Sequence, residues 1–190
     1  MDTVFCRPFA SLLRLSSIAV MVCLSACRQA SPLSLLQQAE AVIESRPDSA
    51  LFLLESIDSL QLSGLGSARY GLLFTEANYK LYNPIASDSL INSAIDFFRS
   101  SGDLPRLATS LYYKAVVIYE LNRHTEAMAC MKEAEQLAER LGDELLKNKV
   151  YDSMGMMNEN ANLFDDAIRY TLSKTLNRLS RANACLMMII

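Results

Sequence analysis

The sequence is poor in side chains that could carry out catalysis or hold a metal ion together. Its only histidine is His124, which the helical pattern places in a turn between two predicted helices. A zinc site or a histidine base needs partner side chains, and none can be named. The chain contains no Cys-x-x-Cys pair and no glycine-rich phosphate loop. We therefore predict no catalytic residue, no cofactor and no metal, and favour a protein that is not an enzyme.

Two further groups of side chains have simple structural interpretations. Asp165 and Asp166 form a pair of acids, but they fall near a predicted helix start, where carboxylates favour the helix dipole. The neighbouring methionines pack in protein cores more often than they bind copper, and they are Met154, Met156 and Met157.

The N-terminus has the organisation of an export signal. Arg7 and Arg14 make its first part positive, and the stretch from Leu15 to Leu24 is apolar. That stretch has the length of a signal-peptide core and is short of the roughly 20 apolar residues that span a membrane. We predict that residues 1–26 are a signal peptide.

The signal ends in Leu24-Ser25-Ala26-Cys27, which resembles the bacterial lipobox. The resemblance implies that the Cys27 thiol accepts diacylglycerol and that cleavage then exposes Cys27 as the new N-terminus. Two or three acyl chains anchor a protein stably in a membrane. Cys6 and Cys23 would leave with the leader.

Only Cys130 and Cys185 would then remain as free thiols. An exported protein could pair them, but nothing in their spacing requires a disulfide. For Cys130 we favour a small buried hydrophobe.

Composition favours helices and argues against nucleic-acid binding. The chain has 190 residues, 51% of them apolar, with 6 Gly and 5 Pro, and its leucines and alanines have a low intrinsic cost in a helix. The net charge is −3. Removing the leader takes away one of 21 acids and two of 18 bases, which leaves −4. No cluster of Lys and Arg provides the basic face that a nucleic-acid binder usually shows.

An internal repeat appears when residues 108–134 are aligned with residues 148–174. In each segment a large residue is followed four positions later by a small one, and a second small residue falls on the next helix. The two segments match with an offset of 40 positions. The matched pairs are Leu111 with Tyr151, Ala115 with Gly155, and Ala127 with Ala167. Small residues at these places let two helices approach closely. Two weaker units lie upstream, at residues 32–60 and 67–99.

This spacing resembles the tetratricopeptide repeat (TPR), a helix–turn–helix unit. The resemblance implies an all-α, right-handed α-solenoid of about four helix pairs over residues 32–180, following a short linker at 27–31. Each pair buries its apolar faces only by stacking on its neighbours. Residues 181–190 form an apolar tail, which we interpret as the start of another segment or an aberrant end of a truncated chain.

Capping signals fall at the expected joints. Proline and an N-cap occur together at Ser31-Pro32, and glycine is followed by an N-cap acid at Gly102-Asp103 and at Gly142-Asp143. We also expect Ser67 to open the third helix and Asp88 to cap the helix after Asn83-Pro84.

In TPR arrays, the first helices of the pairs line a concave surface that binds proteins or extended peptides. The resemblance implies such a groove here, with tyrosines as low-entropy contact surface. The residues that should line it are Phe74, Asn78, Tyr112, Val116, Tyr119, Lys149, Asp152 and Met156. Tyr112 and Val116 replace the lysine and asparagine with which chaperone-binding TPR proteins hold a terminal carboxylate.

The leading interpretation is therefore a lipid-anchored scaffold or sensor module that binds a protein or peptide in the cell envelope. It is similar to TPR lipoproteins of Gram-negative gut bacteria, some of which continue into a membrane helix and a DNA-binding domain. We expect an outer-membrane anchor. A periplasm-facing position is favoured over the surface because residues 28–31 lack an acidic export stretch. The alternative is a glycan-binding surface lipoprotein of a polysaccharide-uptake system, against which the absence of Trp argues.

Overall fold

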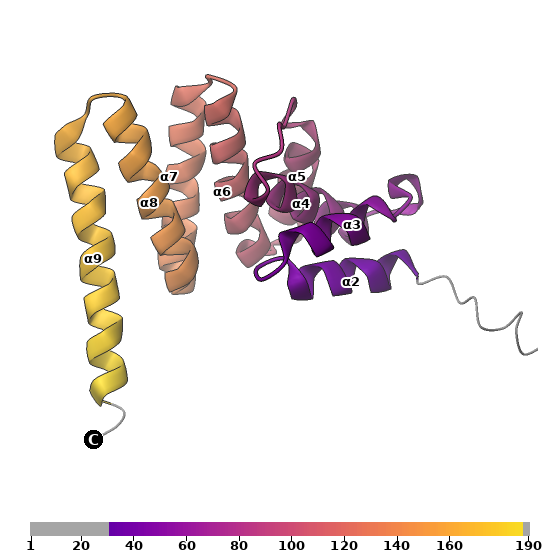
Figure 1. Cartoon of the computed structure of the whole chain (residues 1–190), viewed down its shortest axis with the longest axis horizontal. Helices are drawn as coiled ribbons and strands as arrows, with labels where there is room; N and C mark the ends of the chain where they lie inside the picture. Colours follow the sequence, from indigo (N-terminus) through magenta and orange to yellow (C-terminus); the bar gives the residue numbers. More distant parts are fainter. Residues whose placement is uncertain (1–30, 188–190) are drawn as a thin grey trace, which may run out of the picture. The chain divides into compact units, whose positions relative to one another are not determined.

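The computed structural model describes residues 31–187, except for the side chains of Phe164 and of residues 181–187. Within this range every regular element is a helix, which confirms the predicted all-α class (Figure 1). Its elements are α2 (Pro32–Val42), α3 (Pro47–Glu55), the short 3-10 helix η1 (Ser59–Gln61), α4 (Leu65–Lys80), α5 (Ser89–Ser101), α6 (Leu104–Glu120), α7 (His124–Leu141), α8 (Glu144–Asn160) and α9 (Phe164–Met187).

The helices pack mainly on their neighbours in the sequence. Figure 1 shows α6 beside α7 and α8 beside α9, and these two pairs share extensive contacts, as do α4 with α5 and α2 with α3. Contacts also join α2 to α4, α4 to α6 and α6 to α8. The first helix of each pair is therefore in contact with the first helix of the next.

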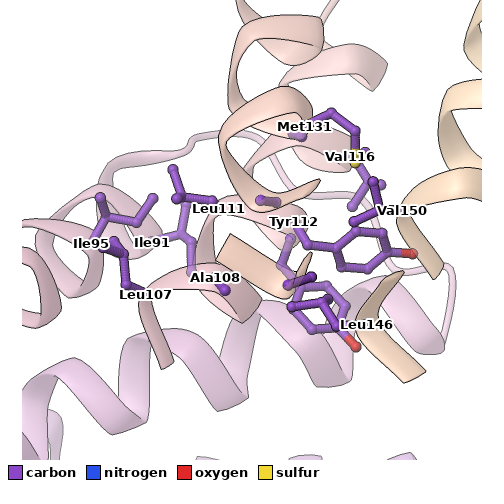
Figure 2. Packing of buried hydrophobic residues seen from close by; sticks show 14 of the residues in the cluster. Ile91, Ile95, Leu107, Ala108, Leu111, Tyr112, Val116, Met131, Leu146 and Val150 are labelled. Carbon is purple, nitrogen blue, oxygen red and sulfur yellow. The ribbon is translucent and has the colours of Figure 1, made fainter. Parts of the chain in front are cut away.

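Two groups of apolar side chains form the core. The smaller group joins α2, α3 and α4, around Leu36, Leu54 and Ala77. The larger one runs from α4 to α9. Figure 2 shows its centre, where side chains of α5, α6, α7 and α8 converge. Tyr112 lies there beside Val150, and it is only 6% exposed.

The turns repeat along the chain with the predicted offset of 40 residues. Gly102 and Gly142 end α5 and α7 in the left-handed conformation, with φ of 74° and 67°. Asp103 and Asp143 then accept hydrogen bonds from the backbone N–H groups of Arg106 and Leu146, at 3.3 and 3.0 Å. These two joints confirm the predicted glycine C-caps and aspartate N-caps.

A second series of left-handed residues lies inside the helix pairs. Tyr82, Asn122 and Asn162 have φ of 57°, 61° and 59°, and they again follow one another at intervals of 40. Asparagine tolerates this conformation, whereas a tyrosine there is strained by about 1 kcal/mol. The recurrence shows that these three turns are built alike.

We predict that Tyr82→Asn raises the free energy of unfolding by about 0.5–1 kcal/mol, because it relieves that strain. Tyr82 is 94% exposed, so the loss of its ring removes little packing. Urea unfolding followed by circular dichroism measures the change. Asn122→Ala, which introduces strain at the equivalent turn, should shift stability in the opposite direction, and a destabilised Tyr82→Asn variant would contradict the prediction.

Three sequence-based expectations are changed by the structure. Helix α4 begins at Leu65, two residues before Ser67, because Gly64 adopts φ of 52° and turns the chain into the helix early. Asp88 occupies the N-cap position of α5 but makes no capping bond. Its carboxylate instead accepts a hydrogen bond from Arg123 at 2.9 Å, a charge-assisted contact. Helix α9 continues past residue 180 to Met187.

A close approach between paired helices occurs at a glycine that the repeat pattern does not single out. A methyl group on Gly71 of α4 would lie 2.9 Å from the backbone oxygen of Leu90 in α5. At Gly155, which the pattern does single out, the nearest atom to such a group is 3.6 Å away. Only the first of these distances is too short for a real contact.

The predicted signal peptide and Cys27 lie outside the described residues. Among the helices that the structure does describe, none combines the length and the apolar character needed to cross a bilayer.

Candidate functional site

A hollow that carries several charged side chains lies between four helices, α2, α4, α6 and α8. We call it the inner groove. Its volume is about 730 Å³. Its lining residues are Glu40, Ile43, Glu44, Leu72, Leu73, Glu76, Asp103, Pro105, Arg106, Thr109, Tyr112, Tyr113, Asp143, Leu145, Leu146 and Lys149. Most of them come from the first helix of a pair or from the residues that flank it.

Two carboxylates from the α2 side of the groove face cations on the other helices. Glu40 pairs with Arg69 of α4 and, at 3.3 Å, with Arg106 of α6. Glu44, in the turn after α2, pairs with Lys80 of α4 at 2.8 Å and with Lys149 of α8 at 2.9 Å. These ion pairs join segments that are up to 105 positions apart.

The charge state of Glu44 follows from these contacts. Partial burial acts to raise its pKa, but the hydrogen bonds from Lys80 and Lys149 outweigh that effect and hold the pKa below its ordinary value. Glu44 is therefore ionised at neutral pH. Its side chain remains 68% exposed, so the ion pair is screened by water and contributes little to stability.

A more deeply buried ion pair involves Glu76, one of the residues that line the groove. The side chain of Glu76 is 7% exposed, and its carboxylate pairs with Lys80 at 2.8 Å. It also accepts a hydrogen bond from the Tyr113 hydroxyl at 2.9 Å. Burial, and then the adjacent Glu76 carboxylate, raise the pKa of Tyr113 well above its usual range. The tyrosine thus stays protonated and acts as a hydrogen-bond donor.

Other tyrosines around this pair are also protonated. Burial, and then the neighbouring Tyr112, raise the pKa of Tyr79 to about 12. The hydroxyl of Tyr112 lies 3.4 Å from the Ser153 oxygen of α8. Together these contacts form a polar layer between α4, α6 and α8 that fixes the floor of the inner groove.

A second hollow of about 600 Å³ lies among the ends of α6, α7, α8 and α9. Lys132 and Arg169 both lie over the ring of Tyr170, at 5.0 and 5.1 Å from its centre. Both cations also form ion pairs within their own helices, with Glu135 and Asp166. These ion pairs lie within single helices, whereas ion pairs of the inner groove join residues from different helices. We therefore take the inner groove as the stronger candidate.

Of the eight residues predicted to line a groove, the structure brings two together in the inner groove, Tyr112 and Lys149. The ring of Tyr112 is mostly buried between helices, so Lys149 is the better exposed of the two. Val116 is 3% exposed and belongs to the core.

The other five predicted residues lie elsewhere. Phe74 stacks on Tyr70, with ring centres 5.5 Å apart, and Asn78 donates a hydrogen bond to the Phe74 carbonyl at 2.8 Å. The remaining three are Tyr119, which lines the second hollow, Asp152, which pairs with Lys174 of α9, and Met156, which is 48% exposed.

Sequence reasoning did not identify Glu40, Glu44 or Arg106 as groove residues. The four-residue spacing of Glu40 and Glu44 places both side chains on one side of a helical turn. This spacing is the feature of the sequence that could have identified them as neighbours. The sequence does not show which cations pair with these two acids, because the cations come from three other helices.

The remaining candidates for chemistry have structural roles. His124 is the first residue of α7 rather than part of the preceding turn, and its ring lies 4.6 Å from that of Tyr119. Asp165 and Asp166 lie in the first turn of α9, as predicted. Met154 and Met157 are buried. Within the described part of the chain, no three His, Cys, Asp or Glu side chains could hold a metal ion together.

Comparison of the chain with protein-family models, with curated proteins and with solved structures finds no match in any of the three.

Proposed function

We propose that residues 32–180 form a TPR-like array of four helix pairs stacked as a right-handed solenoid. Two observations support this proposal. The left-handed turn residues recur at intervals of 40 along the chain. The first helix of each pair also contacts the first helix of the next pair. Both are expected when similar helix pairs stack in the order of the sequence.

We further propose that the protein is a scaffold or sensor module that binds a protein or peptide in the inner groove. The observation that carries this is the lining of the groove by α2, α4, α6 and α8, the helices that form the ligand-binding face of a TPR array. The groove offers charged side chains together with the 68% exposed Leu145. A mixed surface of this kind suits a peptide chain.

The proposed location is the cell envelope, with lipid on Cys27 anchoring the protein to a bacterial membrane. The support is the lipobox and the leader before it. Only residues 28–31 separate Cys27 from the start of α2 at Pro32, so the helical array would be held close to the membrane. Labelled palmitate should be incorporated into the protein and should be lost in a Cys27→Ala variant.

Site-specific photo-crosslinking in intact cells tests the binding proposal. A photo-reactive amino acid at Leu145 lies in the groove, whereas one at Leu60 is 93% exposed on η1, outside the groove. We expect Leu145, but not Leu60, to crosslink to a discrete partner. Identical products from the two positions, or no product from Leu145, would count against a binding groove.

A further inference from the structure

Charged residues are missing from the two stretches of sequence that lie at the start of the helical array. Residues 31–39 and 59–67 contain no Asp, Glu, Lys or Arg, although these types make up 21% of the chain. The first stretch leads into α2, and the second runs from η1 into α4. Both consist mainly of leucine, serine and glutamine.

The two stretches meet in space at Gly66, in the first turn of α4. A Cβ atom on Gly66 would lie 3.5 Å from a side-chain carbon of Leu33 and 3.5 Å from one of Leu62. Three other leucine positions in these stretches face water: Leu33 is 56% exposed, Leu65 is 48% exposed and Leu60 is 93% exposed. We call Leu33, Leu60 and Leu65 the leucine edge.

The leucine edge lies close to the point where a lipid on Cys27 would hold the chain. An extended chain spans at most about 3.6 Å per residue, so the five steps from Cys27 to Pro32 reach about 18 Å at most. Leu33 directly follows Pro32, and Leu65 adjoins Gly66, which contacts Leu33. A membrane that holds the lipid is therefore within about 18 Å of the start of this edge.

From this arrangement we infer that the leucine edge is a membrane-contact surface, which enters the interface of the bilayer that holds the lipid on Cys27. The inference rests on the proposed lipid anchor and specifies which surface of the helical array meets the membrane. Leucine side chains gain free energy when they leave water for the acyl-chain boundary. A lipid surface is the favoured occupant because the short connection to Cys27 places it there.

The charges next to the edge indicate how it meets the lipids. Glu55 and Asp58 precede the second stretch and are exposed. The Asp58 carboxylate accepts hydrogen bonds from the Leu60 backbone N–H at 3.1 Å and from the Gln61 amide at 3.0 Å. The two stretches supply no cation that would attract anionic headgroups. The contact should therefore be apolar, independent of anionic lipids and insensitive to salt.

A single tryptophan can report on this contact, because the chain contains none of its own. The lipidated full-length mature protein carrying Leu60→Trp is reconstituted into vesicles of phosphatidylcholine and phosphatidylethanolamine, with and without brominated acyl chains that quench a nearby indole. We expect bromination to lower its emission about twofold. The control is Leu176→Trp, at a 66% exposed position of α9, which lies at the opposite end of the array from α2 (Figure 1). Its emission should not change.

Substitutions at the rest of the edge should weaken the quenching. In the Leu60→Trp protein, Leu33→Ser/Leu65→Ser removes the other two leucines, so most of the quenching should be lost. The matched control is Leu172→Ser/Leu179→Ser on α9, where the leucines are 57% and 56% exposed, and it should leave the quenching unchanged. If the double edge variant does not fold, Leu33→Ser alone should reduce the quenching.

Two results would overturn the inference. One is a Leu60→Trp emission that bromination does not lower, or lowers no more than that of Leu176→Trp. The other is a blue-shifted but unquenched Leu60→Trp emission, because protein rather than lipid would then cover the edge. Palmitate labelling of the same samples tests the anchor separately. Labelled protein with unquenched Leu60→Trp would leave the anchor standing, whereas protein without palmitate would remove the anchor and the inference with it.

Discussion

Lys80→Met should lower the free energy of unfolding by about 3 kcal/mol. Lys80 is the last residue of α4, and its ammonium group is the only cation paired with Glu76 among the described residues. The Glu76 side chain is 7% exposed, so removing the lysine leaves a buried charge with one remaining hydrogen bond, from Tyr113. Urea unfolding of the purified protein, followed by far-UV circular dichroism, measures the loss.

The double variant Glu76→Gln/Lys80→Met should recover most of that stability. It leaves no charge buried, and the amide oxygen of glutamine can still accept the hydrogen bond from Tyr113. A surface comparison is Arg99→Met, which breaks the pair with Glu133. Both of those side chains are more than one-third exposed, so the change should stay within about 0.5 kcal/mol. If Lys80→Met and Glu76→Gln/Lys80→Met proved equally unstable, the unpaired charge of Glu76 would not be the cause of the lost stability.

The backbone features of this fold could be predicted because they depend on local chemistry. A glycine that ends a helix and an aspartate that caps the next one act within a few residues of each other. This is why Gly102-Asp103 and Gly142-Asp143 were identified correctly. Asp88 was not, because a distant side chain, Arg123, competes for its carboxylate.

The groove could be predicted only in part, because its lining depends on how the helix pairs pack. The repeat pattern correctly places Tyr112 and Val116 on a first helix, but it does not show that α8 covers them. Leu146 and Val150 of α8 do so, and the core buries both α6 residues. The pairing of Glu44 with Lys149 joins residues 105 positions apart, and no periodicity within one helix carries that information.

Gly71→Ala should lower the free energy of unfolding by about 2 kcal/mol. The added methyl group would lie 2.9 Å from the Leu90 carbonyl oxygen, and because this atom belongs to the backbone of α5, the two helices must move apart. Such overpacking costs up to about 3 kcal/mol, of which alanine regains about 1 kcal/mol through its helix propensity.

Gly155→Ala provides the control, because it makes the same chemical change on α8, the first helix of the fourth pair, at a glycine that faces α9. A methyl group there meets Thr171 at 3.6 Å and the Ala167 carbonyl oxygen at 3.8 Å, which are ordinary contacts. Only the gain in helix propensity then remains, so this variant should be more stable than the wild type by up to about 1 kcal/mol. Thermal and urea unfolding should show that Gly71→Ala lowers the free energy of unfolding and that Gly155→Ala raises it. Equal effects at the two glycines would mean that the α4–α5 contact at Gly71 is no tighter than the α8–α9 contact at Gly155.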